Sequence, residues 1–256
     1  MPCGECDQYL WGRPHTCRKL KFLGCPGQAA GCLSEYIVMP ESSCIPVSDT
    51  ISYTQAAISE PLAIGVYAVR QSIPMKESKI GILGFGPIGM SVLLTAMAQG
   101  ASKVYVTDKI SERLEIAQKC CASWTGNPDK EDITALIKEK EPLLLDVVFE
   151  CCGKQEAIDQ AIEILKPGGK LMIIGIPDLS RWSFSVDDLR RKEITITNVR
   201  RQVNCVEPAL EMMEKEIIDV SLMPTHRFSL AETQKAFELV ESYSDGVMKA
   251  MIDFES

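Results

Sequence analysis

The chain has 256 residues, of which 46% are hydrophobic and 24% charged, as expected for a folded protein of one large or two small domains. Its formal net charge of −8 argues against a nucleic-acid or anionic-membrane partner, because both require a basic surface. No apolar run is long enough to cross a membrane and the start does not resemble a signal peptide, so we expect a cytoplasmic protein whose eleven cysteines are thiols or metal ligands.

Residues 1–58 form the first region. They are rich in Cys, Gly and Pro, with short apolar stretches such as Ser34–Met39 and no helical period, which predicts irregular β structure.

Residues 59–200 alternate strand-like and helical segments, which predicts an α/β fold with a doubly wound parallel sheet. The predicted strands are Lys79–Leu83, Lys103–Thr107, Leu144–Phe149, Lys170–Gly175 and Ile194–Val199. Helical spacing is seen over Ile88–Ala98, Ile133–Ile137 and Ala157–Leu165, and Pro167-Gly168-Gly169 is expected to end the last of these. The region 201–256 adds helices at Glu207–Lys215 and Leu230–Glu241 and a final strand at Met248–Phe254.

A glycine-rich loop follows the first of these strands, with the pattern GFGPIG over residues 84–89. Gly84 permits a tight turn, Gly86 lets a pyrophosphate approach the backbone, and Gly89 lets the following helix pack close to the sheet. The helix N-terminus offers free N–H groups to phosphates. The pattern therefore predicts a dinucleotide-binding Rossmann domain.

Asp108 ends the second strand, 19 residues past Gly89. A carboxylate there accepts hydrogen bonds from the adenosine ribose and repels a 2′-phosphate, so NAD rather than NADP is the expected cofactor. The alternative is that the glycines only make a turn and Asp108 only caps a helix.

Motifs along the whole chain resemble the zinc-containing medium-chain alcohol and polyol dehydrogenases, nearest their sorbitol and threonine dehydrogenase branch. They are PCGEC (2–6) with GRPHTC (12–17), GCLSEY (31–36), EPLAIG (60–65), FECCG (149–153), KPGG (166–169), and HRF (226–228) with AF (236–237). The resemblance implies that 1–58 is part of a GroES-like β-rich catalytic domain, 59–200 the NAD-binding domain, and 201–256 the return to the catalytic domain.

The resemblance also implies functional residues, an alcohol or polyol substrate, and a homodimer or homotetramer that pairs through Ile194–Val199. Glu60 and Arg201 are the candidate catalytic residues, and Glu60 would lie at the catalytic zinc. The candidate NAD-binding residues are Gly84, Gly86, Pro87, Ile88, Gly89, Asp108, Arg113, Cys152, Gly175, Ile176, Pro177 and Lys249. As alternatives, Glu60 simply favours a helix N-terminus beside Pro61, and Arg113 and Lys249 are solvated surface residues.

The chain departs from the family at both zinc sites. The Cys and His-Glu ligands of the catalytic zinc have no counterpart here, so the chain is expected to be a fragment or an inactive NAD-binding remnant. In the structural-zinc lobe Cys3, Cys6 and Cys17 are present, but Tyr9 takes the place of the third cysteine. Three thiolates with His15 or Cys25 could hold a metal, but an empty lobe is the simpler expectation.

Overall fold

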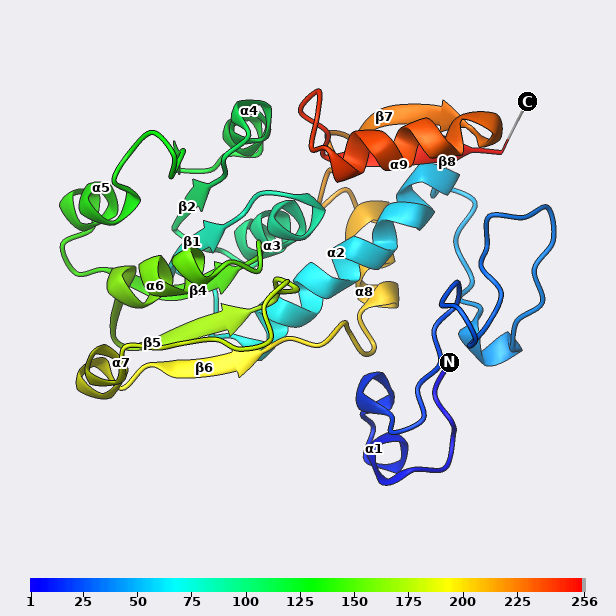
Figure 1. Cartoon of the computed structure of the whole chain (residues 1–256), viewed down its shortest axis with the longest axis horizontal. Helices are drawn as coiled ribbons and strands as arrows, with labels where there is room; N and C mark the ends of the chain where they lie inside the picture. The colour runs from blue at the N-terminus through cyan, green and yellow to red at the C-terminus, as the bar shows by residue number, and fades with distance from the viewer. Residues whose placement is uncertain (255–256) are drawn as a thin grey trace.

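The computed structural model describes residues 1–254, and a six-stranded parallel sheet lies at its centre (Figure 1). The strands are β1 (Lys79–Leu83), β2 (Lys103–Thr107), β3 (Trp124–Gly126), β4 (Leu145–Glu150), β5 (Leu165–Ile173) and β6 (Thr195–Asn198). They lie in the order β3-β2-β1-β4-β5-β6, which is the Rossmann order. The predicted α/β class is therefore confirmed.

Helices cover both faces of the sheet. They are α2 (Tyr53–Gln71), α3 (Pro87–Ala98), α4 (Ser111–Lys119), α5 (Ile133–Lys140), α6 (Gln155–Ile164), α7 (Val186–Lys192) and α8 (Val206–Glu214). Side chains alternate across the strands: Val104 and Val106 pack with α2, α3 and α8 on one face, and Tyr105 packs with α5 and α6 on the other. Both faces are buried, as parallel sheets require.

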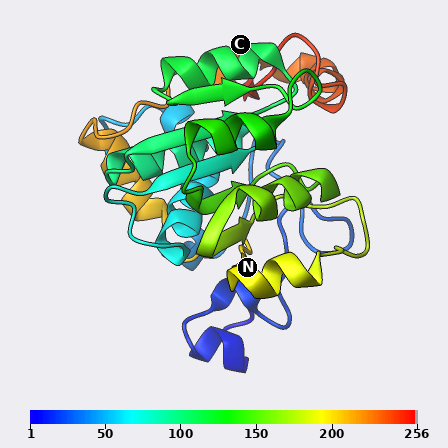
Figure 2. The same ribbon diagram turned by 90° about the vertical axis from the view of Figure 1, so that its left-hand side faces the viewer.

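The segment before α2 differs from the expected β-rich structure. It contains α1 (Asp7–Leu10), two 3-10 turns (Pro14–Thr16 and Glu41–Ser43) and one isolated bridge between Leu23 and Ala29, and no named strand. In Figure 1 the segment lies to one side of the layered body, and in Figure 2 its first, dark blue turns project below that body. The GroES-like prediction for residues 1–58 is thus not supported, because a β-domain needs paired strands and these residues form almost none.

The expected boundary between residues 58 and 59 falls inside α2, which spans Tyr53–Gln71. This helix starts at a capping box in which Ser52 and Gln55 exchange side-chain and backbone hydrogen bonds. Pro61 lies inside it, and has no N–H to give to the Ala57 carbonyl. A helix N-terminus at Glu60, the simple alternative for that residue, is therefore also wrong.

The Pro-Gly-Gly turn lies inside a strand rather than between a helix and a strand. Helix α6 ends at Ile164 and β5 begins at once with Leu165, which pairs with Leu145. Lys170 then pairs with Val147, so the intervening residues bulge out of the ladder, and Gly168 adopts a φ of +75°. Strand β3 and helices α1, α4 and α7 are short elements that the periodicity did not predict.

The C-terminal residues form a small unit of their own. Two parallel strands, β7 (Pro224–Ser229) and β8 (Lys249–Asp253), are joined through a 3-10 turn (Leu230–Glu232) and α9 (Thr233–Glu241). Figure 1 shows this unit beyond one end of α2. Within residues 1–254, no helix combines the length and apolar character needed to cross a membrane.

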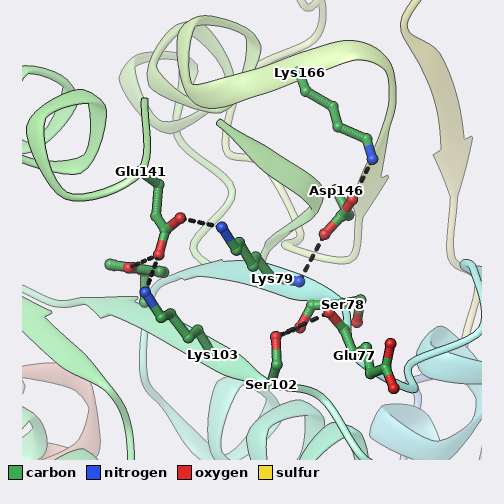
Figure 3. Close-up of polar contacts among 9 residues, drawn as sticks. Glu77, Ser78, Lys79, Ser102, Lys103, Glu141, Asp146 and Lys166 are labelled. Carbon is green, nitrogen blue, oxygen red and sulfur yellow. Dashed lines mark hydrogen bonds and ion pairs between the residues drawn. The ribbon is translucent and has the colours of Figure 1, made fainter. Parts of the chain in front are cut away.

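Charged side chains gather at the amino-terminal edge of the sheet (Figure 3). The glycine loop lies at the opposite edge, after the end of β1. Glu141 is buried and accepts hydrogen bonds from Lys79, Lys103 (2.5 Å) and the Tyr105 hydroxyl (2.6 Å). Asp146 accepts from the Lys79 backbone N–H at 2.7 Å and pairs with Lys166. These contacts join the starts of β1, β2, β4 and β5.

We expect Glu141→Ala to lower the free energy of unfolding by about 2 kcal/mol, because a buried carboxylate is lost and the Tyr105 hydroxyl loses its acceptor. For a chain of this size the thermal midpoint should fall by roughly 6 °C. The matched control is Glu163→Ala, which breaks an exposed pair with Lys138 and should change the free energy by under about 0.5 kcal/mol. Equal midpoints for the two variants would contradict the stabilising role of Glu141.

The same group gives an expected pH dependence. Burial acts to raise the pKa of Glu141, but hydrogen bonds from Lys103, Lys79 and Tyr105 outweigh it and hold the pKa at about 2, below its ordinary 4.5. A depressed pKa stabilises the fold above pH 4.5, and this contribution is lost as the pH falls towards 2. The free energies of unfolding of Glu141→Ala and the unsubstituted chain, measured by denaturant titration, should therefore approach each other as the pH is lowered from 6 to 3.

Candidate functional site

A cavity of about 510 Å³ lies at the carboxyl ends of β1, β2 and β4, where the sheet order reverses. Ligands of open α/β sheets bind at this position. Eight predicted cofactor residues line it, namely Gly84, Gly86, Pro87, Ile88, Asp108, Arg113, Cys152 and Lys249. The other wall comes from α9, β8 and the connection between them.

The glycine loop is tightly packed at two of its three glycines. Gly84 has a φ of +94°, and a Cβ there would lie 2.9 Å from the Cys152 side chain. A Cβ on Gly89 would lie 2.2 Å from the Gly84 carbonyl oxygen, so α3 can approach the loop only without a side chain at that position. Both glycines are therefore required by the fold itself.

Gly86 is different, because the fold does not require a glycine there. It is the N-cap of α3 with a φ of −80°, a conformation open to any residue. A Cβ there would meet no atom closer than the Nη1 of Arg113, at 3.5 Å. The space that a side chain would fill lies in the cavity, in front of the free N–H groups of the helix N-terminus. This space, called the phosphate hollow below, faces N–H donors of the kind that bind phosphates.

Asp108 is held firmly at the end of β2. Its Oδ2 accepts from the Phe85 backbone N–H at 2.6 Å, and its Oδ1 accepts from the Ile110 N–H at 2.8 Å. A carboxylate has about four acceptor sites, so both oxygens keep lone pairs for a further donor. The residue thus orients the glycine loop and also faces the cavity.

Arg113 is buried, with 8% of its surface exposed, so the alternative of a solvated surface residue is wrong. Its Nε donates to the Val247 carbonyl at 2.9 Å, Nη2 donates to the same oxygen, and the guanidinium lies 5.6 Å from the centre of the Tyr243 ring. Its Nη1 points towards Gly86. Arg113 therefore attaches the α9–β8 connection to the Rossmann domain and brings a cation to the phosphate hollow.

The sequence did not reveal the wall opposite the loop. Phe237, Val240 and Tyr243 are largely exposed and line the cavity together with Met248 and Ile252. Through the resemblance, only Lys249 and the motifs HRF and AF pointed to this region. Apolar residues at helical spacing are typical of any amphipathic helix, so the pattern cannot distinguish a ligand wall from a core face.

Gly175, Ile176 and Pro177 follow β5 but do not line this cavity. A Cβ on Gly175 would lie 2.2 Å from the Gly153 nitrogen, and one on Gly153 would lie 2.4 Å from the Ile176 carbonyl oxygen. The two loops therefore touch, and Gly175 is needed for that contact. The Ile176 side chain is 92% exposed, at the carboxyl edge where the resemblance expects the nicotinamide.

Neither predicted catalytic residue lines the cavity. Glu60 is exposed on α2, and Arg201 stacks on the Phe22 ring at 4.0 Å with a left-handed φ of +52°. Within residues 1–254, the only group of at least three His, Cys, Asp or Glu ligand atoms that could share a metal is Cys3, Cys6 and Cys17. The described residues thus do not fit a catalytic zinc at Glu60.

The three predicted cysteines of the N-terminal segment do come together. Their sulfur atoms lie within 4.8 Å of one another. Backbone N–H groups of Arg18 and Tyr9 point at the Cys6 sulfur and lower its pKa from 9.0 to about 7. The suggested fourth ligands are wrong: Cys25 is outside the group, and the Nε2 of His15 bonds to the Tyr67 hydroxyl at 3.2 Å. The site therefore offers three thiols and no fourth ligand among residues 1–254.

A parallel sheet in this order, with a glycine-lined phosphate hollow at its switch point, defines a Rossmann-type α/β protein. The zinc-binding dehydrogenase family matches residues 87–215. Sorbitol dehydrogenase of Bacillus subtilis is 31% identical over 253 residues, which are 98% of this chain and 71% of that protein. The chain belongs to the zinc-binding dehydrogenase family, medium-chain type, whose members bind NAD(P) and zinc.

Two crystal structures show the same architecture. An Escherichia coli oxidoreductase/dehydrogenase of unknown specificity matches with a TM-score of 0.93 and 28% identity, over 100% of this chain and 74% of that one. A zinc-binding dehydrogenase from Sinorhizobium meliloti, bound to NADP, matches with a TM-score of 0.89 and 25% identity, over 98% of this chain and 74% of that one.

Proposed function

We propose that this chain binds NAD and belongs with the dehydrogenases that move a hydride between a secondary alcohol of a polyol and NAD. The observation that carries the proposal is Gly86, whose missing side chain leaves the phosphate hollow open although the fold does not require a glycine there. The polyol follows from the sorbitol dehydrogenase relative. When bound, the nicotinamide accepts or gives the hydride.

The chain's own residues have separate tasks in this proposal. The N-terminus of α3 and Arg113 hold the pyrophosphate, Asp108 accepts from the adenosine ribose, and Lys249 adds positive charge at the cavity wall. Cys152 and Ile88 pack beside the adenosine half. Gly175, Ile176 and Pro177 would border the nicotinamide, outside the cavity that the adenosine half fills.

A second candidate is an NAD-binding module without turnover. For these 256 residues it is favoured by the absence around Glu60 of a metal-ligand group within residues 1–254. A turnover assay distinguishes the two candidates, and both require NAD binding.

The edge strand β6 has no neighbour on its outer side in the described sheet, and we propose that it pairs with its copy in a dimer.

The NAD preference has its own test. We expect NADH to bind at least tenfold more tightly than NADPH, about 1.4 kcal/mol, because a 2′-phosphate would approach the Asp108 carboxylate. Asp108→Asn keeps one oxygen acceptor but removes the charge, so it should strengthen NADPH binding and narrow the gap. Calorimetric titration of both chains with NADH and NADPH measures these affinities.

Asn is preferable to Ala because alanine would remove both backbone hydrogen bonds of Asp108 and disturb the loop. Asp129→Asn, which alters an exposed pair with Lys109, is the matched control and should leave both affinities unchanged. Equal NADH and NADPH affinities in the unsubstituted chain would refute the assigned preference.

A further inference from the structure

The N-terminal segment has almost no hydrophobic core. In residues 1–52 the only buried side chains are His15 and Cys17, while Leu10, Trp11 and Tyr36 are mainly exposed. Small units that bury so little apolar surface need another source of stability, such as a disulfide or a metal. The fold of this segment therefore calls for a cross-link near Cys17.

The three thiols have the spacing of metal ligands. The Cys6 and Cys17 sulfur atoms are 3.8 Å apart, and the Cys3 sulfur lies within 4.8 Å of both. Zn–S bonds of about 2.3 Å in a tetrahedron place neighbouring sulfur atoms roughly 3.8 Å apart. Backbone N–H groups of Cys3 and Lys19 donate to the Cys17 sulfur at 3.3 and 3.4 Å, and such donors stabilise a thiolate.

The fourth corner of the tetrahedron is open. No other His, Cys, Asp or Glu within residues 1–254 joins the group. Tyr9, which stands where the family resemblance expects a cysteine, lies on α1 with 41% of its surface exposed. A phenol is a poor ligand for zinc, and it carries its oxygen on a rigid ring much farther from the backbone than a cysteine sulfur.

We propose that Cys3, Cys6 and Cys17 form an open three-thiolate site for zinc or another thiophilic divalent ion, with an exchangeable fourth ligand from solvent. This differs from a closed four-thiolate site, in which the protein supplies every ligand and the ion is purely structural. An open position admits water or a small thiol, and the ion is released more readily to a chelator.

Cobalt(II) tests the proposal, because thiolate-to-cobalt absorption grows with the number of bound thiolates. The full chain, reduced with a phosphine, is titrated with Co²⁺ and then with a small thiol. We expect one Co²⁺ per chain and, on addition of the thiol, an absorbance increase that matches a fourth thiolate. Tyr9→Cys should hold Co²⁺ at least tenfold more tightly in competition with a chelator and should not respond to the thiol.

Two further variants are matched controls. Tyr9→Ser removes the phenol without adding a thiol and should behave like the unsubstituted chain. Cys32→Ser removes an exposed cysteine outside the group and should bind Co²⁺ normally, whereas Cys6→Ser should lose the thiolate absorption. The proposal is overturned if the unsubstituted chain shows no thiolate-to-cobalt absorption. It is equally overturned if that chain already shows four thiolates and ignores the added thiol, since another cysteine then closes the site.

Discussion

Gly86→Val should weaken NADH binding at least a hundredfold while the chain stays folded. The valine γ-carbons would occupy the hollow in front of the α3 N-terminus, where the pyrophosphate must approach the backbone. The backbone conformation at this position accepts any residue, so the only expected structural penalty is a poorer N-cap, about 1 kcal/mol. The thermal midpoint should fall by no more than about 4 °C. Quenching of protein fluorescence by NADH measures the affinity.

Gly89→Ala is the comparison that separates binding from folding. Its Cβ would lie 2.2 Å from the Gly84 carbonyl oxygen, so α3 must move away from the sheet. We expect a much lower thermal midpoint, or no folded protein, together with loss of NADH binding. If Gly86→Val bound NADH as well as the unsubstituted chain does, the phosphates would not lie at this loop, and the proposed function would fail at its first step.

The second large effect is an absence of turnover. We expect the purified 256-residue chain, supplied with zinc and NAD, to produce NADH from sorbitol, xylitol, threonine or simple secondary alcohols no faster than a protein-free control. A catalytic zinc needs three protein ligands and an open fourth position. Among residues 1–254 neither Glu60 nor either histidine, His15 or His226, belongs to such a group of ligand atoms.

The turnover assay is informative only for a chain that binds its cofactor. NADH binding is therefore measured on the same preparation, and a catalytically competent sorbitol dehydrogenase under the same conditions shows that the assay detects turnover. Steady NADH production by this chain with any of these alcohols would contradict the prediction, and would mean that other residues activate the substrate oxygen.

The cofactor-binding half of the site could be predicted from sequence because its signals are local. A strand, three glycines, a helix, a second strand and Asp108 follow one another within 30 residues, and each has one physical role. The predicted bounds of β1 and β2 are confirmed residue for residue. Sequence also predicted the three-cysteine group, although only the fold shows that its fourth corner is open.

The remaining features depend on contacts between distant residues, which periodicity cannot reveal. Helix α2 begins seven residues before Glu60 because Ser52 and Gln55 cap it, and its buried face tolerates Pro61. Arg113 is buried because Val247, more than a hundred positions later, supplies an acceptor. The N-terminal segment was expected to contain strands, but an isolated stretch of apolar residues becomes a strand only when another pairs with it.

Helix α2 also cannot be fully packed until late in the synthesis of the chain. Its apolar side, including Leu62 and Val66, packs on α3 and on α8, and α8 begins only at Val206. A ribosome must therefore synthesise every strand of the large sheet before one flank of this helix can be covered. Until then the apolar face of this 19-residue helix is exposed to chaperones and to other unfinished chains. Synthesis rate and temperature should therefore affect the soluble yield more strongly than the stability of the finished fold does.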